Sequence, residues 1–121
     1  MAAGLFALAG PAHADIIDAR FKTPGQITHT GAQILSVIRC TNGDTMKMDV
    51  LVKQDDNLAR SVGYVEFHCT GREQSFVVQT YYNTVNTFTP GPATACFSPR
   101  TGPGGQGGFQ VCGDGALEPS P

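Results

Sequence analysis

The chain has 121 residues, with 15 glycines, eight prolines, four cysteines, no tryptophan and a formal net charge of −2. Its basic and acidic residues are interspersed, so the charge pattern excludes the positive surface by which proteins bind nucleic acid or an anionic membrane. The frequent glycine, proline, threonine and valine, without any sustained helical periodicity, favour a small all-β domain.

The first 14 residues have the pattern of an export signal. A short apolar run at 5–10 precedes the small residues Ala12 and Ala14, which a signal peptidase requires at its cleavage site. We expect a signal peptide at 1–14, extending upstream of the given start because no basic residue opens it, and cleavage after Ala14. No segment approaches the length of about 20 apolar residues that spans a membrane. The mature protein is therefore expected to be secreted, with no membrane span.

Short runs of strand-forming residues, separated by turn residues, follow this segment. Pro24-Gly25 predicts a turn after the first of them, and Asn42-Gly43 predicts a hairpin between the second and third. In the third run, apolar and polar residues alternate, as in a sheet with one buried face. The predicted strands are 16–21, 33–41, 45–53, 59–69, 74–82, 93–98 and 109–112.

Six or seven short strands at regular spacing predict an antiparallel β-sandwich of immunoglobulin-like type. We expect residues 15–112 to form this single domain. The segment 99–108 holds five glycines and two prolines and is predicted to be an irregular loop. Residues 113–121 are predicted to be a disordered tail.

The four cysteines, Cys40, Cys69, Cys96 and Cys112, predict two disulfides, because an even number in a small exported domain normally forms a covalent framework. Cys40 and Cys69 each end a strand, and the two strands run in the same direction, which favours a Cys40–Cys69 bridge between two packed sheets. A Cys96–Cys112 bridge would close the glycine-rich loop. The other two connectivities remain open at this point.

Four segments resemble small secreted actinobacterial proteins that have an immunoglobulin-like sandwich and no assigned activity. The similarity covers roughly residues 30 to 98 and implies the fold, but no functional residues. The segments are Val37-Ile38-Arg39-Cys40-Thr41, Val50-Leu51-Val52-Lys53-Gln54, Phe67-His68-Cys69-Thr70-Gly71-Arg72-Glu73-Gln74 and Phe88-Thr89-Pro90-Gly91-Pro92-Ala93-Thr94-Ala95.

The sequence offers no catalytic motif, so we expect the protein not to be an enzyme. A bridged cysteine has no thiolate, and no Gly-x-Ser-x-Gly motif is present. Glu66 and His68 share one strand face and, with His29, would make an incomplete metal site, so a solvated polar face is the preferred interpretation. Asp55-Asp56-Asn57 lacks the spacing of a calcium loop and is predicted to be a polar turn. We expect no metal and no cofactor.

The leading functional hypothesis is a non-catalytic, exported recognition or envelope-associated domain that binds a protein or another cell-surface component through its loops. A secreted protease inhibitor, with Arg100 as the residue that enters the protease pocket, is one alternative. A carrier of a small ligand is another. The candidate partner loop comprises Phe97, Arg100, Gln106 and Phe109, and a candidate aromatic platform comprises Tyr81, Tyr82 and Phe88.

Overall fold

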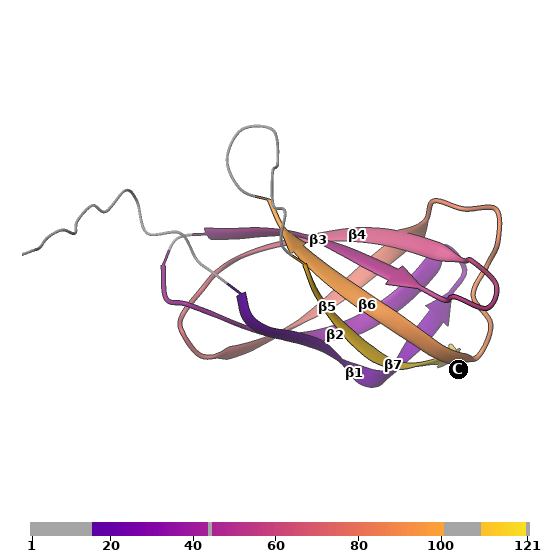
Figure 1. Cartoon of the computed structure of the whole chain (residues 1–121), viewed down its shortest axis with the longest axis horizontal. Coiled ribbons are helices and arrows are strands. Elements are labelled where there is room, and N and C mark those ends of the chain that lie inside the picture. The colour runs from indigo at the N-terminus through magenta and orange to yellow at the C-terminus, as the bar shows by residue number, and fades with distance from the viewer. Residues whose placement is uncertain (1–15, 44, 101–109, 121) are drawn as a thin grey trace, which may run out of the picture.

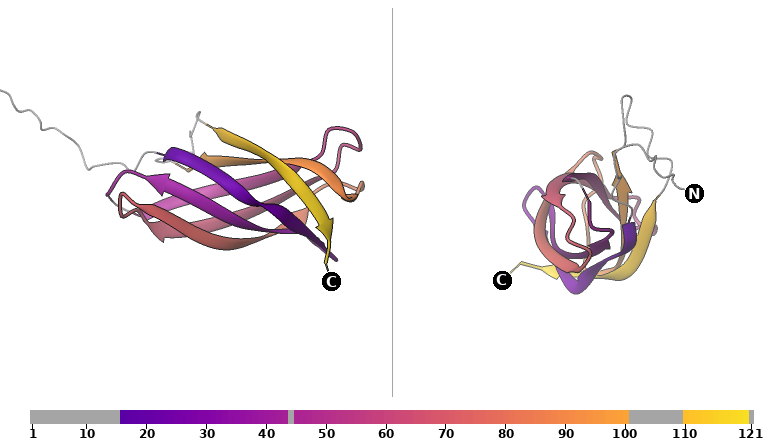
Figure 2. Two further views of the ribbon diagram at one scale, coloured as in Figure 1. Left: turned by 90° about the horizontal axis from the view of Figure 1, so that it is seen from below. Right: turned by 90° about the vertical axis from the view of Figure 1, so that its left-hand side faces the viewer.

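A computed structural model of the chain describes residues 16–43, 45–100 and 110–120. Its seven strands close into one barrel in the order β1-β2-β5-β4-β3-β6-β7 (Figures 1 and 2). The all-β class and seven strands are confirmed, whereas the closed barrel differs from the predicted sandwich of two separate sheets. The strands are β1 (Ile16–Thr28), β2 (Gly31–Cys40), β3 (Thr45–Lys53), β4 (Arg60–His68), β5 (Glu73–Tyr82), β6 (Gly91–Pro99) and β7 (Val111–Pro119).

Long antiparallel ladders join the strands within two groups, β1-β2-β5 and β4-β3-β6-β7. A short ladder, here called the β4–β5 seam, joins the groups on one side. It contains the pairs Ser61–Tyr82 and Val62–Tyr81. Beyond them the two strands diverge without further pairing in the described chain. This seam is one of the two places at which the barrel differs from a sandwich.

The second closure lies between β1 and β7, where residues 25–27 pair in parallel with residues 117–119. The predicted turn at Pro24-Gly25 is wrong, because β1 continues through it to Thr28. The β1–β2 register instead shifts between Lys22 and Gln26. Proline donates no ladder hydrogen bond, so it is accommodated at such an irregularity, which bends the strand. After the bend, β1 reaches both neighbours.

The C-terminal segment corrects another prediction. Residues 113–119 belong to β7 and not to a disordered tail, and Leu117 is buried. This segment packs against β1, and Gly115 is needed for that packing. A Cβ atom on Gly115 would overlap the ring of Phe21, and one on Gly113 would contact the backbone of Arg20. The absence of a side chain at Gly115 makes room for the ring of Phe21 between the two strands.

Both predicted disulfides are present. Cys40 and Cys69 have Cα atoms 5.7 Å apart and connect the end of β2 to the residue after β4. Cys96 and Cys112 face each other in the β6–β7 ladder, with Cα atoms 4.0 Å apart. The hairpin predicted at Asn42-Gly43 does not form, because β2 pairs with β5 and β3 pairs with β4. The connection crosses between the two groups of strands instead.

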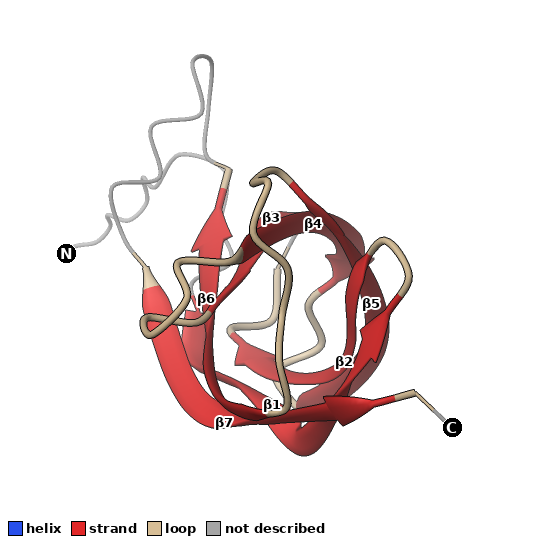
Figure 3. Cartoon of the chain, turned by 90° about the vertical axis from the view of Figure 1, so that its right-hand side faces the viewer, coloured by secondary structure: helices blue, strands red, loops and turns tan. Residues whose placement is uncertain are grey.

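The strands surround a common interior, seen end-on in Figure 3. Inward-facing side chains fill this interior. The predicted alternation in β3 is confirmed, since its methionines and valines point inward and are almost fully buried. Two buried hydroxyl groups pair, Ser61 with Thr80 at 2.6 Å, and Thr80 also donates to the carbonyl oxygen of Ala32. Ser36 is buried as well, and its hydroxyl has no hydrogen-bond partner among the described residues. The packed interior makes the barrel a rigid support for its surface.

Candidate binding surface

The outward side chains of β4 and β5 form a partly apolar surface. We call this surface, formed by Val62, Tyr64, Glu66, Val77, Gln79 and Tyr81, the β4–β5 face. Alternation along each strand points them outward, and the Val62–Tyr81 pair brings the two rows together. The exposed fractions are 43% for Val62, 41% for Tyr64, 64% for Val77 and 56% for Tyr81. Apolar groups gathered in this way mark interaction sites more often than scattered ones do.

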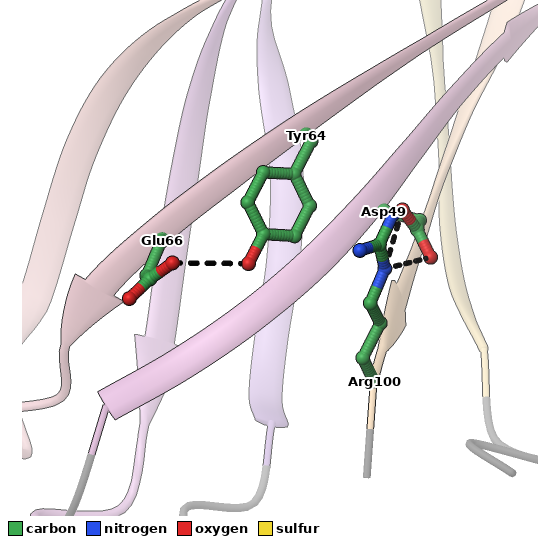
Figure 4. Close-up of polar contacts among 4 residues, drawn as sticks. All are labelled: Asp49, Tyr64, Glu66 and Arg100. Carbon is green, nitrogen blue, oxygen red and sulfur yellow. Dashed lines mark hydrogen bonds and ion pairs between the residues drawn. The ribbon is translucent and has the colours of Figure 1, made fainter. Parts of the chain in front are cut away.

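A polar cluster borders this face (Figure 4). Arg100 follows β6, and its backbone N–H donates to the carbonyl oxygen of Lys47 at 2.7 Å, which fixes the start of the side chain. Its guanidinium Nε donates to both carboxylate oxygens of Asp49, at 3.0 and 2.9 Å, and its Nη2 donates to Oδ1 at 2.6 Å. The guanidinium carbon lies 4.4 Å from the centroid of the Tyr64 ring. The ring and the carboxylate thus hold the cation from two sides.

Tyr64 extends the cluster along β4. Its hydroxyl donates to Oε1 of Glu66 at 3.1 Å. Loss of solvent around the phenol raises the pKa of Tyr64, and the hydrogen bond to the Glu66 carboxylate raises it further. The hydrogen bond to Asp49 raises the pKa of Arg100. The Tyr64 phenol therefore stays neutral and the Arg100 guanidinium stays cationic across the physiological pH range. As all these side chains are largely exposed, the ion pair adds little to stability.

An open hollow of about 510 Å³ joins the face to the cluster. Tyr64 and Tyr81 supply aromatic walls, and Arg100 and Asp49 supply polar groups. Gly63 lies between them, where β4 passes so close to β5 that a Cβ atom would be 2.9 Å from the carbonyl oxygen of Gln79. The lining residues are Asp49, Val62, Gly63, Tyr64, Gln79, Tyr81 and Arg100. The hollow can accept a side chain of a partner that combines apolar and polar contacts.

The residues of the predicted partner loop are separated by the fold. Phe97 is fully buried in the core and is not available to a partner, because β6 directs it inward. Arg100 is exposed, yet it is paired with Asp49. Gln106 and Phe109 lie outside the described residues. Of this loop, only Arg100 is placed on the candidate surface.

The predicted aromatic platform is divided between the two faces of the barrel wall. Tyr81 points outward, whereas Tyr82 points inward and packs against Phe88, with ring centroids 5.2 Å apart. The Tyr82 hydroxyl accepts a hydrogen bond from the backbone N–H of Phe88 at 2.9 Å. The platform is therefore wrong as a unit, because neighbouring strand residues face opposite sides. Tyr81 alone contributes to the candidate surface.

Sequence reasoning missed most of the β4–β5 face. Val62, Val77 and Gln79 were not candidates, and neither was Asp49 in the bordering polar cluster. One signal in the sequence could have indicated this face. Val62 and Val77 are apolar residues that alternate with inward side chains and therefore point outward. Their closeness depends on the pairing of β4 with β5, which a local pattern does not indicate.

A buried polar network at the other end of the barrel was also missed. Gln54 is 3% exposed and donates through Nε2 to the carbonyl oxygens of Thr89 and Pro92, at 2.7 and 3.1 Å. Its Oε1 accepts from the Thr89 N–H and from Asn57. Both polar atoms of this side chain are used to connect the turn after β3, the loop before β6 and the start of β6. The network is thus structural.

The described residues contain no group of three or more histidine, cysteine, aspartate or glutamate side chains placed to hold a metal. A second hollow, of about 440 Å³, is lined by Asp55, Asp56 and Asp114, with Lys53 among them. Asp114 accepts a hydrogen bond from Thr94. Within the part of the chain that is described, no helix is long and apolar enough to cross a membrane.

Comparison with protein-family models, with curated proteins and with solved structures finds no match to this chain. The resemblance to small secreted actinobacterial proteins therefore stays a prediction.

Proposed function

We propose that the protein is an exported, non-catalytic recognition domain that binds a protein partner through the β4–β5 face. The observation that carries the proposal is the gathering of Val62, Tyr64, Val77 and Tyr81, each more than two-fifths exposed, on adjacent strands of a rigid wall. Tyrosine in particular supplies a large contact area at low entropic cost. The paired Arg100 and Asp49 form a polar rim beside the apolar centre, which is the usual arrangement at interfaces.

We further propose that the barrel is a closed relative of the immunoglobulin-like sandwich. The pairings β1-β2-β5-β4 and β3-β6-β7 are those of the two sheets of a constant-type domain. The difference is that β4 pairs along its whole length with β3 and for only two residues with β5. Scaffolds of this type commonly serve recognition, which supports the proposal by analogy alone.

Export is supported by the cysteines. No described cysteine is free, and disulfides persist in oxidising compartments outside the cytosol. The proposed signal peptide at 1–14 lies outside the described residues. Intact-mass measurement of protein secreted by its own cells tests it, since the expected mature chain begins at Asp15. A secreted chain that retains residues 1–14 would contradict this part of the proposal.

The protease-inhibitor alternative is less well supported. An inhibitor residue must leave its own protein to enter the pocket of the protease, and Arg100 is held by Asp49 and by the Tyr64 ring. A carrier function would need an internal space, and the barrel axis is occupied by buried side chains such as Phe97, Met48 and Ile34. Recognition by the outer wall is therefore the function that we propose.

Photocrosslinking tests the surface. A photoreactive amino acid in place of Val77 should give a discrete adduct on cells that secrete the protein, and Tyr81→Asp in the same chain should abolish it. The matched control is the same amino acid in place of Val85, which is 98% exposed but lies in the loop after β5. No adduct from position 77, or the same adduct from both positions, would overturn the proposal.

A further inference from the structure

The β4–β5 seam leaves two strand edges facing each other without pairing. The register of Val62 with Tyr81, if continued, would oppose Tyr64 to Gln79 and Glu66 to Val77, and neither pair forms in the described chain. On its other side β4 is fully paired with β3, and β5 is fully paired with β2. Each strand thus has one paired and one unpaired edge over this stretch.

The direction of the β4 backbone groups follows from contacts at both ends of the seam. At one end, the Arg60 carbonyl oxygen accepts from the Asn83 N–H at 3.1 Å, so it points toward β5. At the other end, the His68 carbonyl oxygen accepts from Nε2 of Gln74 at 2.9 Å and points the same way. Alternate residues of a strand direct their N–H and C=O groups to the same side. Tyr64 and Glu66 therefore present theirs to the open part of the seam.

The side chain of Gln74 binds backbone groups of β4 and of the residues after it at the wide end of the seam. Besides donating to His68, it accepts through Oε1 from the Thr70 N–H at 3.2 Å. It thereby occupies the backbone groups that a neighbouring strand would otherwise bind. Beneath the seam, the rings of Phe67 and Phe76 stack with centroids 4.3 Å apart and form an apolar floor. Val62 and Tyr64 provide apolar contacts on the outer side.

We propose that the partner of the β4–β5 face contributes an extended segment that pairs with the free edge of β4 at Tyr64 and Glu66. This inference rests on the proposed function and names the form of its ligand. The unpaired N–H and C=O groups select an extended backbone, as in other cases of strand addition. The apolar floor and outer wall select apolar side chains at alternate positions of that segment. The β4–β5 ladder has only two residue pairs, so the seam can widen at little cost in hydrogen bonds.

Glu66 allows a test of the backbone contact itself. Its N–H points to the seam and away from the β3 ladder, so Glu66→Pro deletes a donor to the added strand while leaving the β3–β4 pairing in place. Glu66→Ala is the matched control, because it removes the same carboxylate and keeps the N–H. The probe is an acetylated peptide of strand length with alternating valine and threonine, and its counterpart with N-methyl groups on alternate amides is the peptide control.

The unmodified peptide should bind to the full mature chain and shift the amide resonances of Tyr64 and Glu66. Glu66→Pro should bind the peptide about fivefold or more weakly than Glu66→Ala, the effect of losing one net hydrogen bond, because both variants lack the carboxylate and only the proline variant lacks the N–H. Gln74→Ala should strengthen binding, because it frees the groups of His68 and Thr70, and this variant decides the question if Glu66→Pro does not fold. Equal binding of both peptides, or no gain from Gln74→Ala, would overturn strand addition. If the photoreactive amino acid at position 77 gives no adduct in an otherwise unchanged chain, the recognition function itself is refuted.

Discussion

The two disulfides should differ in their contribution to stability. The perturbation is paired replacement by alanine, Cys40→Ala with Cys69→Ala in one variant and Cys96→Ala with Cys112→Ala in the other. The bridges close loops with sequence separations of 29 and 16 residues. On the chain-entropy model, their removal costs about 3.6 and about 3.1 kcal/mol, respectively.

Packing widens this difference. Cys40 and Cys69 are both fully buried, whereas Cys112 is exposed and only Cys96 is buried. Loss of the buried sulfur atoms adds roughly 1 kcal/mol or more to the first variant. The first bridge also links the two groups of strands near the wide end of the β4–β5 seam, where no ladder joins them. The second bridge lies within an extended antiparallel ladder that persists without it.

Urea unfolding of both variants, followed by far-ultraviolet circular dichroism, measures the two free energies of unfolding. We expect the first variant to lose roughly 1 to 2 kcal/mol more than the second, against a total stability of about 5 to 15 kcal/mol for a domain of this size. The slope of the unfolding free energy with urea serves as the control for two-state behaviour. A second variant that is as unstable as the first, or less stable, would refute the reasoning.

Three further outcomes follow from single side chains. Gly115→Ala should lower the free energy of unfolding by about 1 to 3 kcal/mol, because the new methyl group meets the buried ring of Phe21; an unchanged melting temperature would contradict this packing. Ser36→Ala should raise it by about 1 kcal/mol, because a buried hydroxyl without a partner is removed, and a less stable variant would show that the hydroxyl is satisfied. Glu66→Gln should lower the pKa of Tyr64, measured by phenolate absorbance against a Tyr64→Phe control, because the carboxylate that holds the neutral phenol is lost. Since the raised pKa gives a stabilisation that is present below the ordinary tyrosine value and is lost as the pH rises through the folded-state value, this variant should also lose less stability at high pH than the wild type.

The sequence predicted local features of the fold well. Period-two alternation placed the apolar residues of β3, such as Met48, on the buried face, because the side-chain direction of a strand depends only on its own backbone. The positions of Cys40 and Cys69 at strand ends favoured the bridge that the structure contains, although they left the other two connectivities open. The outward orientation of Glu66 and His68 was predicted for the same reason.

Features that depend on distant segments were not predicted. Asn42-Gly43 favours a hairpin locally, but the pairing of β2 with β5 determines the path of the chain. The strand at residues 113–119 was missed, because the packing of Gly115 against Phe21 involves residues far apart in the sequence. The pairing of Arg100 with Asp49, 51 residues away, has no local signal either. The candidate surface could not be assembled without the strand order.

The parallel contact between β1 and β7 determines when the barrel can close. The first strand finds one of its two neighbours in the last, so the closed wall cannot form until nearly all of the chain is available. Contacts between such distant segments form slowly compared with local ones. For a protein that is exported as proposed, the barrel would therefore still be open while the chain crosses the membrane. Under that proposal, the barrel can close only after both β1 and β7 have crossed the membrane.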